Sequence, residues 1–227
     1  MVHSENGFLL SYIKYGDADA VLHSFTKEKG FRSYFIKSVF TQKSRKKSYL
    51  QPLNELNFKI RDKSSSSMPE VLSIEPLKIV ESPGSKSDSV LFFVSEFLNH
   101  ILRDETEGQL VYYEVCKLLT EIENRNYSAH LVFMVKLLKV LGVAPFISEG
   151  KFLDADGGVF TDEPVNSLYS ETVSNYWKNI LSESEPYQIN IESLSRPAVL
   201  DSILFYYSCH HSGFKTPKSL EIIRQLW

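Results

Sequence analysis

The first 75 residues alternate apolar and polar side chains with the two-residue period of β-strands. Short segments rich in aromatic and β-branched residues are separated by turn-forming residues such as Gly16-Asp17 and Gly30. This pattern predicts strands at residues 7–15, 20–26, 31–40, 50–61 and 71–74. Five short antiparallel strands are too few for an immunoglobulin-like sandwich, and they fit a small five-stranded β-barrel of the OB type.

From residue 90 onward the apolar positions follow the 3.6-residue period of amphipathic helices. The segment at 128–141 is apolar on almost every side, so we expect it to be the central helix of a second core. The stretch at 146–165 interrupts the helical pattern and predicts a hairpin that turns at Asp156-Gly157-Gly158. The full set of expected helices is about 90–102, 107–124, 128–141, 168–181, 196–210 and 217–226.

Proline, glycine and serine cluster at residues 82–88, between the two patterns. We therefore predict an α+β multidomain protein with an OB-type barrel at 1–81, a linker at 82–88 and a mostly α-helical domain at 89–227. The hairpin at about 146–165 is then an insertion in the helical domain. A chain of 227 residues with 43% apolar residues is long enough to bury two such cores.

A net charge of −3 conceals a strongly basic segment in the predicted barrel. Residues 27–63 hold eleven Lys or Arg against three acidic residues, which is a local charge of +8. Aromatic residues lie between these cations, and this composition suits a surface for single-stranded nucleic acid, with cations for phosphates and aromatic faces for bases. Most basic runs are solvated faces, so charge alone leaves both interpretations open.

The candidate DNA-binding residues come from this segment. The cations expected to contact phosphate are Lys27, Lys29, Arg32, Lys37, Lys43, Arg45, Lys46, Lys47, Lys59 and Arg61. The aromatic residues that are candidates for base stacking are Tyr34, Phe40 and Tyr49. Because most aromatic residues of a small barrel fill its core, the pattern does not decide which of these three face DNA.

No motif for catalysis, metal binding or nucleotide binding is complete. Asp154 to Val165 lacks the turn glycine and the closing glutamate of a calcium loop. Gly84-Ser85-Lys86-Ser87 lacks the glycine-lysine step of a phosphate loop. Cys209-His210-His211 falls short of the four ligands of a structural zinc site. We expect no catalytic residue, no metal and no cofactor.

The cysteine content and the absence of targeting signals indicate where the protein works. Two cysteines, Cys116 and Cys209, are compatible with a reducing compartment. No segment approaches the ~20 apolar residues of a membrane span, and the first residues lack the features of a signal peptide. We therefore expect a cytoplasmic, nucleoid-associated protein with no membrane partner.

The order of short motifs in the first 60 residues resembles the N-terminal barrel of the RecO family of bacterial recombination mediators. The similarity is looser in the second domain, where it includes Leu137-Leu138, Gly157-Gly158 and Tyr206-Tyr207. The matching pieces of the barrel are Gly7-Phe8, Tyr15-Gly16-Asp17, Phe25-Thr26 followed by a charged turn and Gly30, Lys43-Ser44-Arg45, and Leu50-Gln51-Pro52-Leu53.

This resemblance implies a non-enzymatic mediator of homologous recombinational repair. Proteins of the family bind single- and double-stranded DNA, anneal complementary strands and, with the partner RecR, help RecA replace single-strand-binding protein. The resemblance also implies that the helical domain docks the acidic, phenylalanine-ended tail of single-strand-binding protein. Lys136 and Lys139 are candidate partners of that tail, and the alternative is that both extend into solvent.

One departure from the family concerns zinc. Many members carry a four-cysteine zinc site in the stretch equivalent to 146–165, which contains no cysteine here. We expect a zinc-free hairpin held by the packing of Phe146, Phe152 and Phe160. Two rival functions stay open: a protein interaction scaffold with incidental DNA affinity, and a metal-dependent nuclease, which the scattered acidic residues disfavour.

Overall fold

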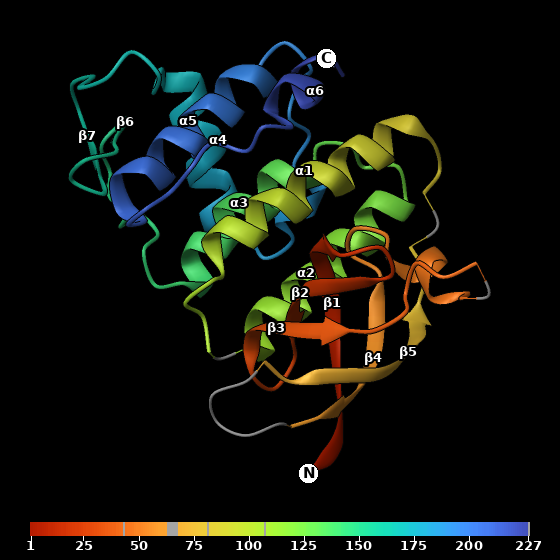
Figure 1. Ribbon diagram of the computed structural model, residues 1–227. Coiled ribbons are helices and arrows are strands. Elements are labelled where there is room, and N and C mark those ends of the chain that lie inside the picture. Colours follow the sequence, from red (N-terminus) through yellow and green to blue (C-terminus); the bar gives the residue numbers. More distant parts are fainter. Residues whose placement is uncertain (43, 63–67, 81, 107, 227) are drawn as a thin grey trace. The chain divides into compact units, whose positions relative to one another are not determined.

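The computed structural model describes residues 1–42, 44–62, 68–80, 82–106 and 108–226 (Figure 1). The chain forms two compact units, Met1–Tyr113 and Glu114–Trp227. None of the helices in the described ranges combines the length and the apolarity needed to cross a lipid bilayer.

The first unit begins with a five-stranded barrel, as predicted. Its strands pair in the order β1-β2-β3-β5-β4, and β4 pairs back with β1 to close the ring. β1 can serve both neighbours because it is long and a bulge between Leu9 and Ser11 bends it. Among the described strands of the barrel, β3 and β5 run parallel, and the other neighbouring pairs are antiparallel. The strands are β1 (Val2–Tyr15), β2 (Asp19–Thr26), β3 (Gly30–Ile36), β4 (Glu55–Arg61) and β5 (Glu70–Lys78).

Two strands are shorter than their apolar patterns predicted, because backbone turns end them. β3 ends at Ile36 instead of residue 40, since Ser38 adopts a positive φ of 55° and Phe40 folds back to donate its N–H to the carbonyl of Ala18. β4 begins at Glu55 instead of residue 50, since Leu53 has a φ of 60° and residues 50–54 form a turn. An apolar pattern indicates which residues are buried, but it does not show where the backbone turns.

Helix α1 (Ser85–Ile101) corrects the predicted linker at 82–88. The helix starts at Ser85, so the linker prediction is wrong for residues 85–88. α1 packs on β1, where Ser95 donates a hydrogen bond to the carbonyl of Leu10 and Ser11 donates to Asn99 at 3.1 Å. The first compact unit therefore extends beyond the predicted barrel boundary at residue 81 and includes the start of α2 (Gln109–Glu123).

The second unit is mostly helical and has α3 (Ala129–Val140) at its centre. Nine of the twelve residues of α3 are buried, which confirms the predicted central helix. Around it lie α4 (Glu171–Ser182) and α5 (Arg196–His210), both in contact with α3. The short helix α6 (Leu220–Arg224) covers only half of the predicted 217–226 segment.

The predicted hairpin in this unit consists of β6 (Phe152–Asp154) and β7 (Val159–Thr161). Phe160 is buried and Phe152 half-buried, but Phe146 is 73% exposed, so the expected packing of Phe146 is wrong. Polar contacts from the helices hold the hairpin in addition: Ser174 accepts the N–H of Leu153 at 3.0 Å, Lys178 donates to Gly150, and the ring nitrogen of His210 lies 2.5 Å from the carbonyl of Ala155.

A buried carboxylate joins the strands at one end of the barrel. Glu5 on β1 is 5% exposed and accepts hydrogen bonds from the Tyr34 hydroxyl of β3 and from the Lys29 ammonium, both at 2.5 Å. His3 lies 2.7 Å away. Burial raises the pKa of Glu5, but the bonds from Lys29, Tyr34 and His3 outweigh it and bring the pKa below its ordinary value of 4.5. The network therefore stabilises the fold above that value and is lost as pH falls through the lowered pKa.

Replacing Tyr34 with Phe is expected to destabilise the protein. Tyr34→Phe removes one donor from the buried Glu5 carboxylate while keeping the ring, so the free energy of unfolding should fall by about 1–3 kcal/mol at pH 7. Urea titration followed by circular dichroism measures it. The matched control is Tyr15→Phe, because Tyr15 is 64% exposed. Equal stability of the two variants would contradict the role assigned to Tyr34.

Candidate nucleic-acid interface

Strand β4 carries two cations on the outer surface of the barrel. Leu56, Phe58 and Ile60 point into the core, and the alternating positions Lys59 and Arg61 are exposed. The two-residue period of a strand places both cations on one face. Rigid strand positions are suited to hold positive charge at fixed spacing along a phosphate backbone.

The described part of the basic loop after β3 holds two exposed cations. Lys43 lies outside the described residues. Arg45 and Lys47 are exposed, whereas Lys46 is half-buried and donates to the carbonyl of Leu72 at 3.3 Å. A short 3-10 helix, η1 (Lys46–Tyr49), fixes this part of the loop. The loop therefore contributes Arg45 and Lys47 as the cations best placed to meet phosphate.

The cations around the β2–β3 hairpin are engaged within the protein. Lys29 pairs with Glu5 and Lys37 pairs with Glu70 at 3.1 Å. The ammonium of Lys27 lies 5.1 Å from the ring centroid of Tyr113. Arg32 is half-buried. Glu5 and Glu70 both fall outside the segment 27–63, so counting charge along the chain overstated the positive charge of this surface.

The three predicted stacking residues are less available than expected. Tyr34 is 1% exposed inside the barrel, so its assignment as a base-stacking residue is wrong. Phe40 and Tyr49 are half-buried and pack against the barrel core. Tyr34 occupies an inward position of β3, and Phe40 and Tyr49 cover the core from outside the strands. In both places apolar burial stabilises the fold.

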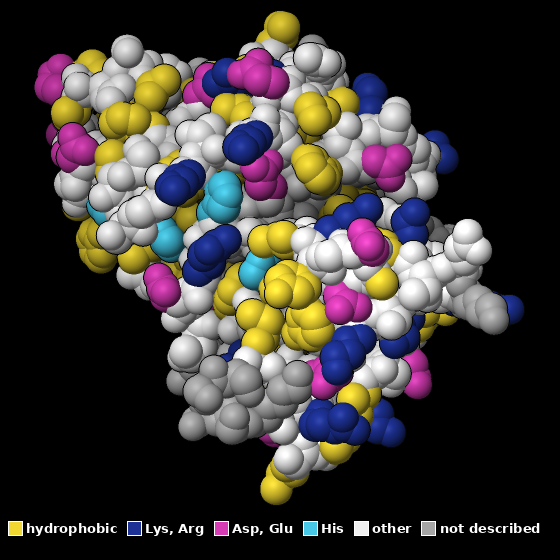
Figure 2. Space-filling model, in the orientation of Figure 1, with side chains coloured by type: hydrophobic (Ala, Val, Ile, Leu, Met, Phe, Trp, Pro, Cys, Tyr) yellow, Lys and Arg dark blue, Asp and Glu magenta, His cyan; other side chains and the backbone are white. Residues whose placement is uncertain are grey.

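An aromatic residue that sequence reasoning missed, Tyr15, lies on the outside of the barrel. Tyr15 of β1 is 64% exposed, and its ring centroid lies 5.7 Å from that of Phe35 on β3. Tyr12 lies on the other face of β1, opposite the inward residue Leu22, and packs against Phe40 at 5.7 Å beside the ammonium of Lys14. Figure 2 shows hydrophobic side chains gathered over β2 and β3, next to Lys and Arg side chains. The outward positions of β1 were the available signal.

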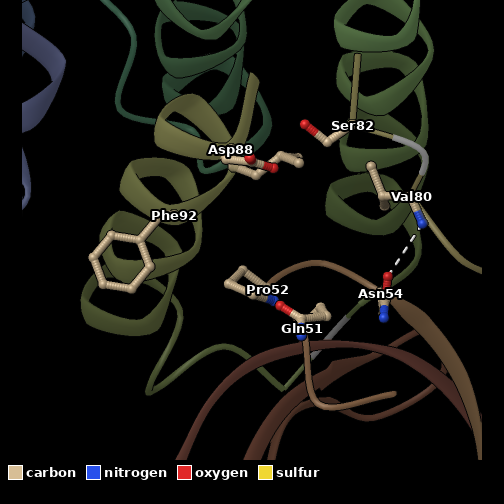
Figure 3. Close-up of a pocket in the computed structure, with 8 residues that line it drawn as sticks. Gln51, Pro52, Asn54, Val80, Ser82, Asp88 and Phe92 are labelled. Atoms are coloured by element: carbon tan, nitrogen blue, oxygen red, sulfur yellow. Dashed lines mark hydrogen bonds between the residues drawn. The ribbon is translucent and has the colours of Figure 1, made fainter. Parts of the chain in front are cut away.

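A pocket of about 440 Å³ in the same unit is chemically unsuited to phosphate. Among the described residues that line it, the charged side chain is the carboxylate of Asp88, and Asn54 accepts the N–H of Val80 at 3.1 Å (Figure 3). A carboxylate repels phosphate. The lining residues are Gln51, Pro52, Asn54, Val80, Ser82, Asp88, Leu91 and Phe92.

In the second unit, Lys136 and Lys139 share a pocket of about 200 Å³. The ammonium of Lys136 pairs with Glu114 at 2.9 Å and lies 5.1 Å from the ring centroid of Tyr187. With 19% of its side chain exposed, Lys136 does not extend into solvent. The other residues that line this pocket are Ile180, Leu181, Glu183, Ser184 and Pro186.

The hairpin turn meets the end of α5 through side chains that are common metal ligands. The Cys209 thiol lies 3.4 Å from Asp156, and this contact, after burial, raises the pKa of the thiol. A metal site would need Cys209 as a thiolate. Across the residues that the structure describes, no three His, Cys, Asp or Glu side chains are arranged to hold a metal ion.

We expect the hairpin to be insensitive to chelators. Its described contacts are hydrogen bonds and packing, so removal of divalent metal should leave the melting temperature unchanged. Differential scanning fluorimetry with and without EDTA measures this. His210→Ala, which removes the contact with Ala155, is expected to lower the melting temperature in both conditions. A large shift on chelation would show that a metal holds this region.

Comparison with known proteins agrees with these features. The family described as "Recombination protein O N terminal" matches residues 1–80, which include all five barrel strands. The DNA repair protein RecO of Flavobacterium psychrophilum is 28% identical over 96% of both chains, and that of Flavobacterium johnsoniae is 25% identical over the same share. The RecO of Phocaeicola vulgatus is 26% identical over the full length of both. The chain is therefore similar to RecO proteins along its whole length, and its barrel matches the N-terminal model of that family.

Proposed function

We propose that this chain is a non-enzymatic, DNA-binding mediator of recombinational repair. The observation that carries the proposal is the set of exposed cations, Arg45, Lys47, Lys59 and Arg61, on the OB-type barrel of a chain similar to RecO proteins. Its relatives along the full length are named DNA repair proteins. Barrels of this type bind oligonucleotides on a strand face and its bordering loops.

Strand annealing follows from charge neutralisation. Two complementary strands repel each other through their phosphates, and a surface that holds both strands with Lys and Arg removes much of that repulsion. The cations of β4 and the basic loop contact phosphate, which is the same in every nucleotide, so the surface needs no sequence preference. This chemistry requires neither a nucleophile nor a cofactor.

We also assign this protein the partners of a recombination mediator. With RecR, it helps RecA load onto single-stranded DNA coated with single-strand-binding protein, and it works in the cytoplasm at the nucleoid. The pocket at Lys136 and Lys139 accepts the acidic, phenylalanine-ended tail of the single-strand-binding protein. Ile180, Leu181 and Pro186 offer apolar surface for the phenylalanine ring. Lys136 already pairs with Glu114, so Lys139 is the principal partner of the tail carboxylates.

Removing two exposed cations is expected to weaken DNA binding and to flatten its salt dependence. For single strands, each phosphate contact contributes about −0.7 to the slope of log affinity against log salt. The double variant Arg45→Ala/Lys47→Ala should therefore reduce the slope by about 1.4. Fluorescence anisotropy of a labelled oligonucleotide at several salt concentrations measures it.

The control for this experiment removes the same net charge elsewhere. Lys86 and Lys151 are exposed cations outside the proposed interface, and Lys86→Ala/Lys151→Ala should keep the wild-type slope. Equal slopes for both double variants would contradict the interface. If the wild-type protein binds DNA weakly and fails to anneal complementary strands, the scaffold function is favoured instead.

Charge reversal at Lys139 is expected to weaken binding of the single-strand-binding protein tail. A glutamate at this position faces the acidic peptide with like charge, so the affinity of Lys139→Glu should fall by roughly 10-fold or more. Titration of a fluorescent tail peptide measures it. Lys151→Glu, which changes an exposed lysine of the same unit, should keep wild-type affinity. Indifference of binding to Lys139→Glu would exclude this pocket.

A further inference from the structure

The outer face of β1, β2 and β3 carries aromatic and aliphatic side chains that leave part of the barrel surface apolar. The register places Ile13 opposite Val21 and Val21 opposite Phe35, so the three lie in one row across the strands. Ile13 is 60% exposed, whereas Val21 and Phe35 are half-buried. Tyr15 extends the row, and its ring meets that of Phe35 edge to face at 83°. The inward side chains of the same strands, such as Leu22 and Ile36, are fully buried. Exposed apolar surface of this kind marks a binding site more often than an isolated residue does.

A second ring pair continues the same face. His23 of β2 and Phe31 of β3 stack at 5.8 Å with an interplanar angle of 20°. The His23 ring is fixed by a hydrogen bond to Ser33 at 2.8 Å. Burial, with Arg103 nearby, lowers the pKa of His23, which keeps the ring neutral at pH 7. The face therefore carries two ring pairs in succession, of which Tyr15 is exposed and Phe35, His23 and Phe31 are half-buried.

A cationic side chain lies at each end of this apolar surface, and one of the two is paired with an acid. Lys37 continues the outward positions of β3 beyond Phe35 and is 61% exposed even though it pairs with Glu70. Arg103 is exposed and acts electrostatically on His23 at the other end. Asp19 of β2, opposite Tyr15 in the register, accepts the Ser38 N–H at 2.8 Å and keeps its negative charge. Flat rings between cations complement unpaired bases joined by phosphates.

We infer that Tyr15 and Phe35, continued by Phe31 and His23, form a base-stacking platform that makes the barrel prefer single-stranded to duplex DNA. In a duplex both faces of each base are covered by its neighbours, so only unpaired bases can rest on these rings. The inference rests on the proposed DNA-binding function and adds the form of DNA that the site takes. It also separates two tasks, with Arg45, Lys47, Lys59 and Arg61 holding phosphates and the platform holding bases.

The decisive experiment combines an aromatic substitution with removal of the bases. The affinity of wild type, Tyr15→Ala, Phe35→Ala and Tyr15→Phe is measured by anisotropy for a single strand, the same strand with central abasic sites, and a duplex. Tyr15→Ala should bind the single strand about 10-fold more weakly, with its salt slope unchanged, and should lose less than that on the abasic strand. Tyr15→Phe retains the ring and should bind like wild type, and duplex affinity should stay the same throughout.

Tyr12→Ala is the matched control. Tyr12 lies three residues away on the same strand, opposite the inward residue Leu22, and therefore projects from the other face. It should keep wild-type affinity, and circular dichroism should show that every variant is folded.

Two failures can be told apart. A wild-type protein that binds no DNA overturns the proposed function and this inference together. A wild-type protein that binds DNA, with Tyr15→Ala indistinguishable from it or equally weakened on single strand, abasic strand and duplex, overturns the platform alone. Wild-type DNA affinity of Tyr15→Ala also points to a protein as the occupant of this face. An equal loss for Tyr12→Ala moves the stacking site to the other face of β1.

Discussion

The closure of the barrel depends on one long, bent strand and on the buried carboxylate near its start. β1 pairs with β4 through its first half and with β2 through its second half. Glu5, in the half that pairs with β4, gathers Tyr34 from β3 and Lys29 from the β2–β3 turn. A buried carboxylate is tolerated only when it is paired and hydrogen-bonded. The Glu5 network therefore favours the native arrangement of β1 and β3 and also stabilises it.

The alternation of side chains divides the aromatic residues of the barrel between stability and binding. Tyr34 and its neighbour Phe35 occupy consecutive positions on β3, and the first is fully buried while the second belongs to the outer face. A one-residue change of register would exchange these roles. The bulge in β1 and the Glu5 network hold the register, and in this way the core determines which rings and which cations are offered to a ligand.

Much of this architecture is predictable from the sequence, because it reflects periodicity and burial. The barrel, the central helix α3, the 146–165 hairpin and the outward positions of Lys59 and Arg61 follow from local pattern. Ion pairs between residues that are far apart in the sequence cannot be predicted from local pattern. Glu5 and Glu70 neutralise Lys29 and Lys37 from outside the basic segment, and Glu114 pairs with Lys136 across the second core. The turns at Ser38 and Leu53 use positive φ at residues other than glycine, so composition gives little warning of them.

The hydrogen bond from Ser95 of α1 to the carbonyl of Leu10 affects how this barrel can be exchanged between relatives. The sequence match to the family ends at residue 80, but the compact unit continues to Tyr113. The part of β1 around Phe8 and Leu10 is covered by α1 and by Tyr112, whose ring lies 4.6 Å from that of Phe8. A chimaera joined at residue 80 would leave this apolar side of β1 facing a foreign helix. The segment that matches the family model is thus shorter than the segment that a chimaera must include for the barrel to stay soluble and folded.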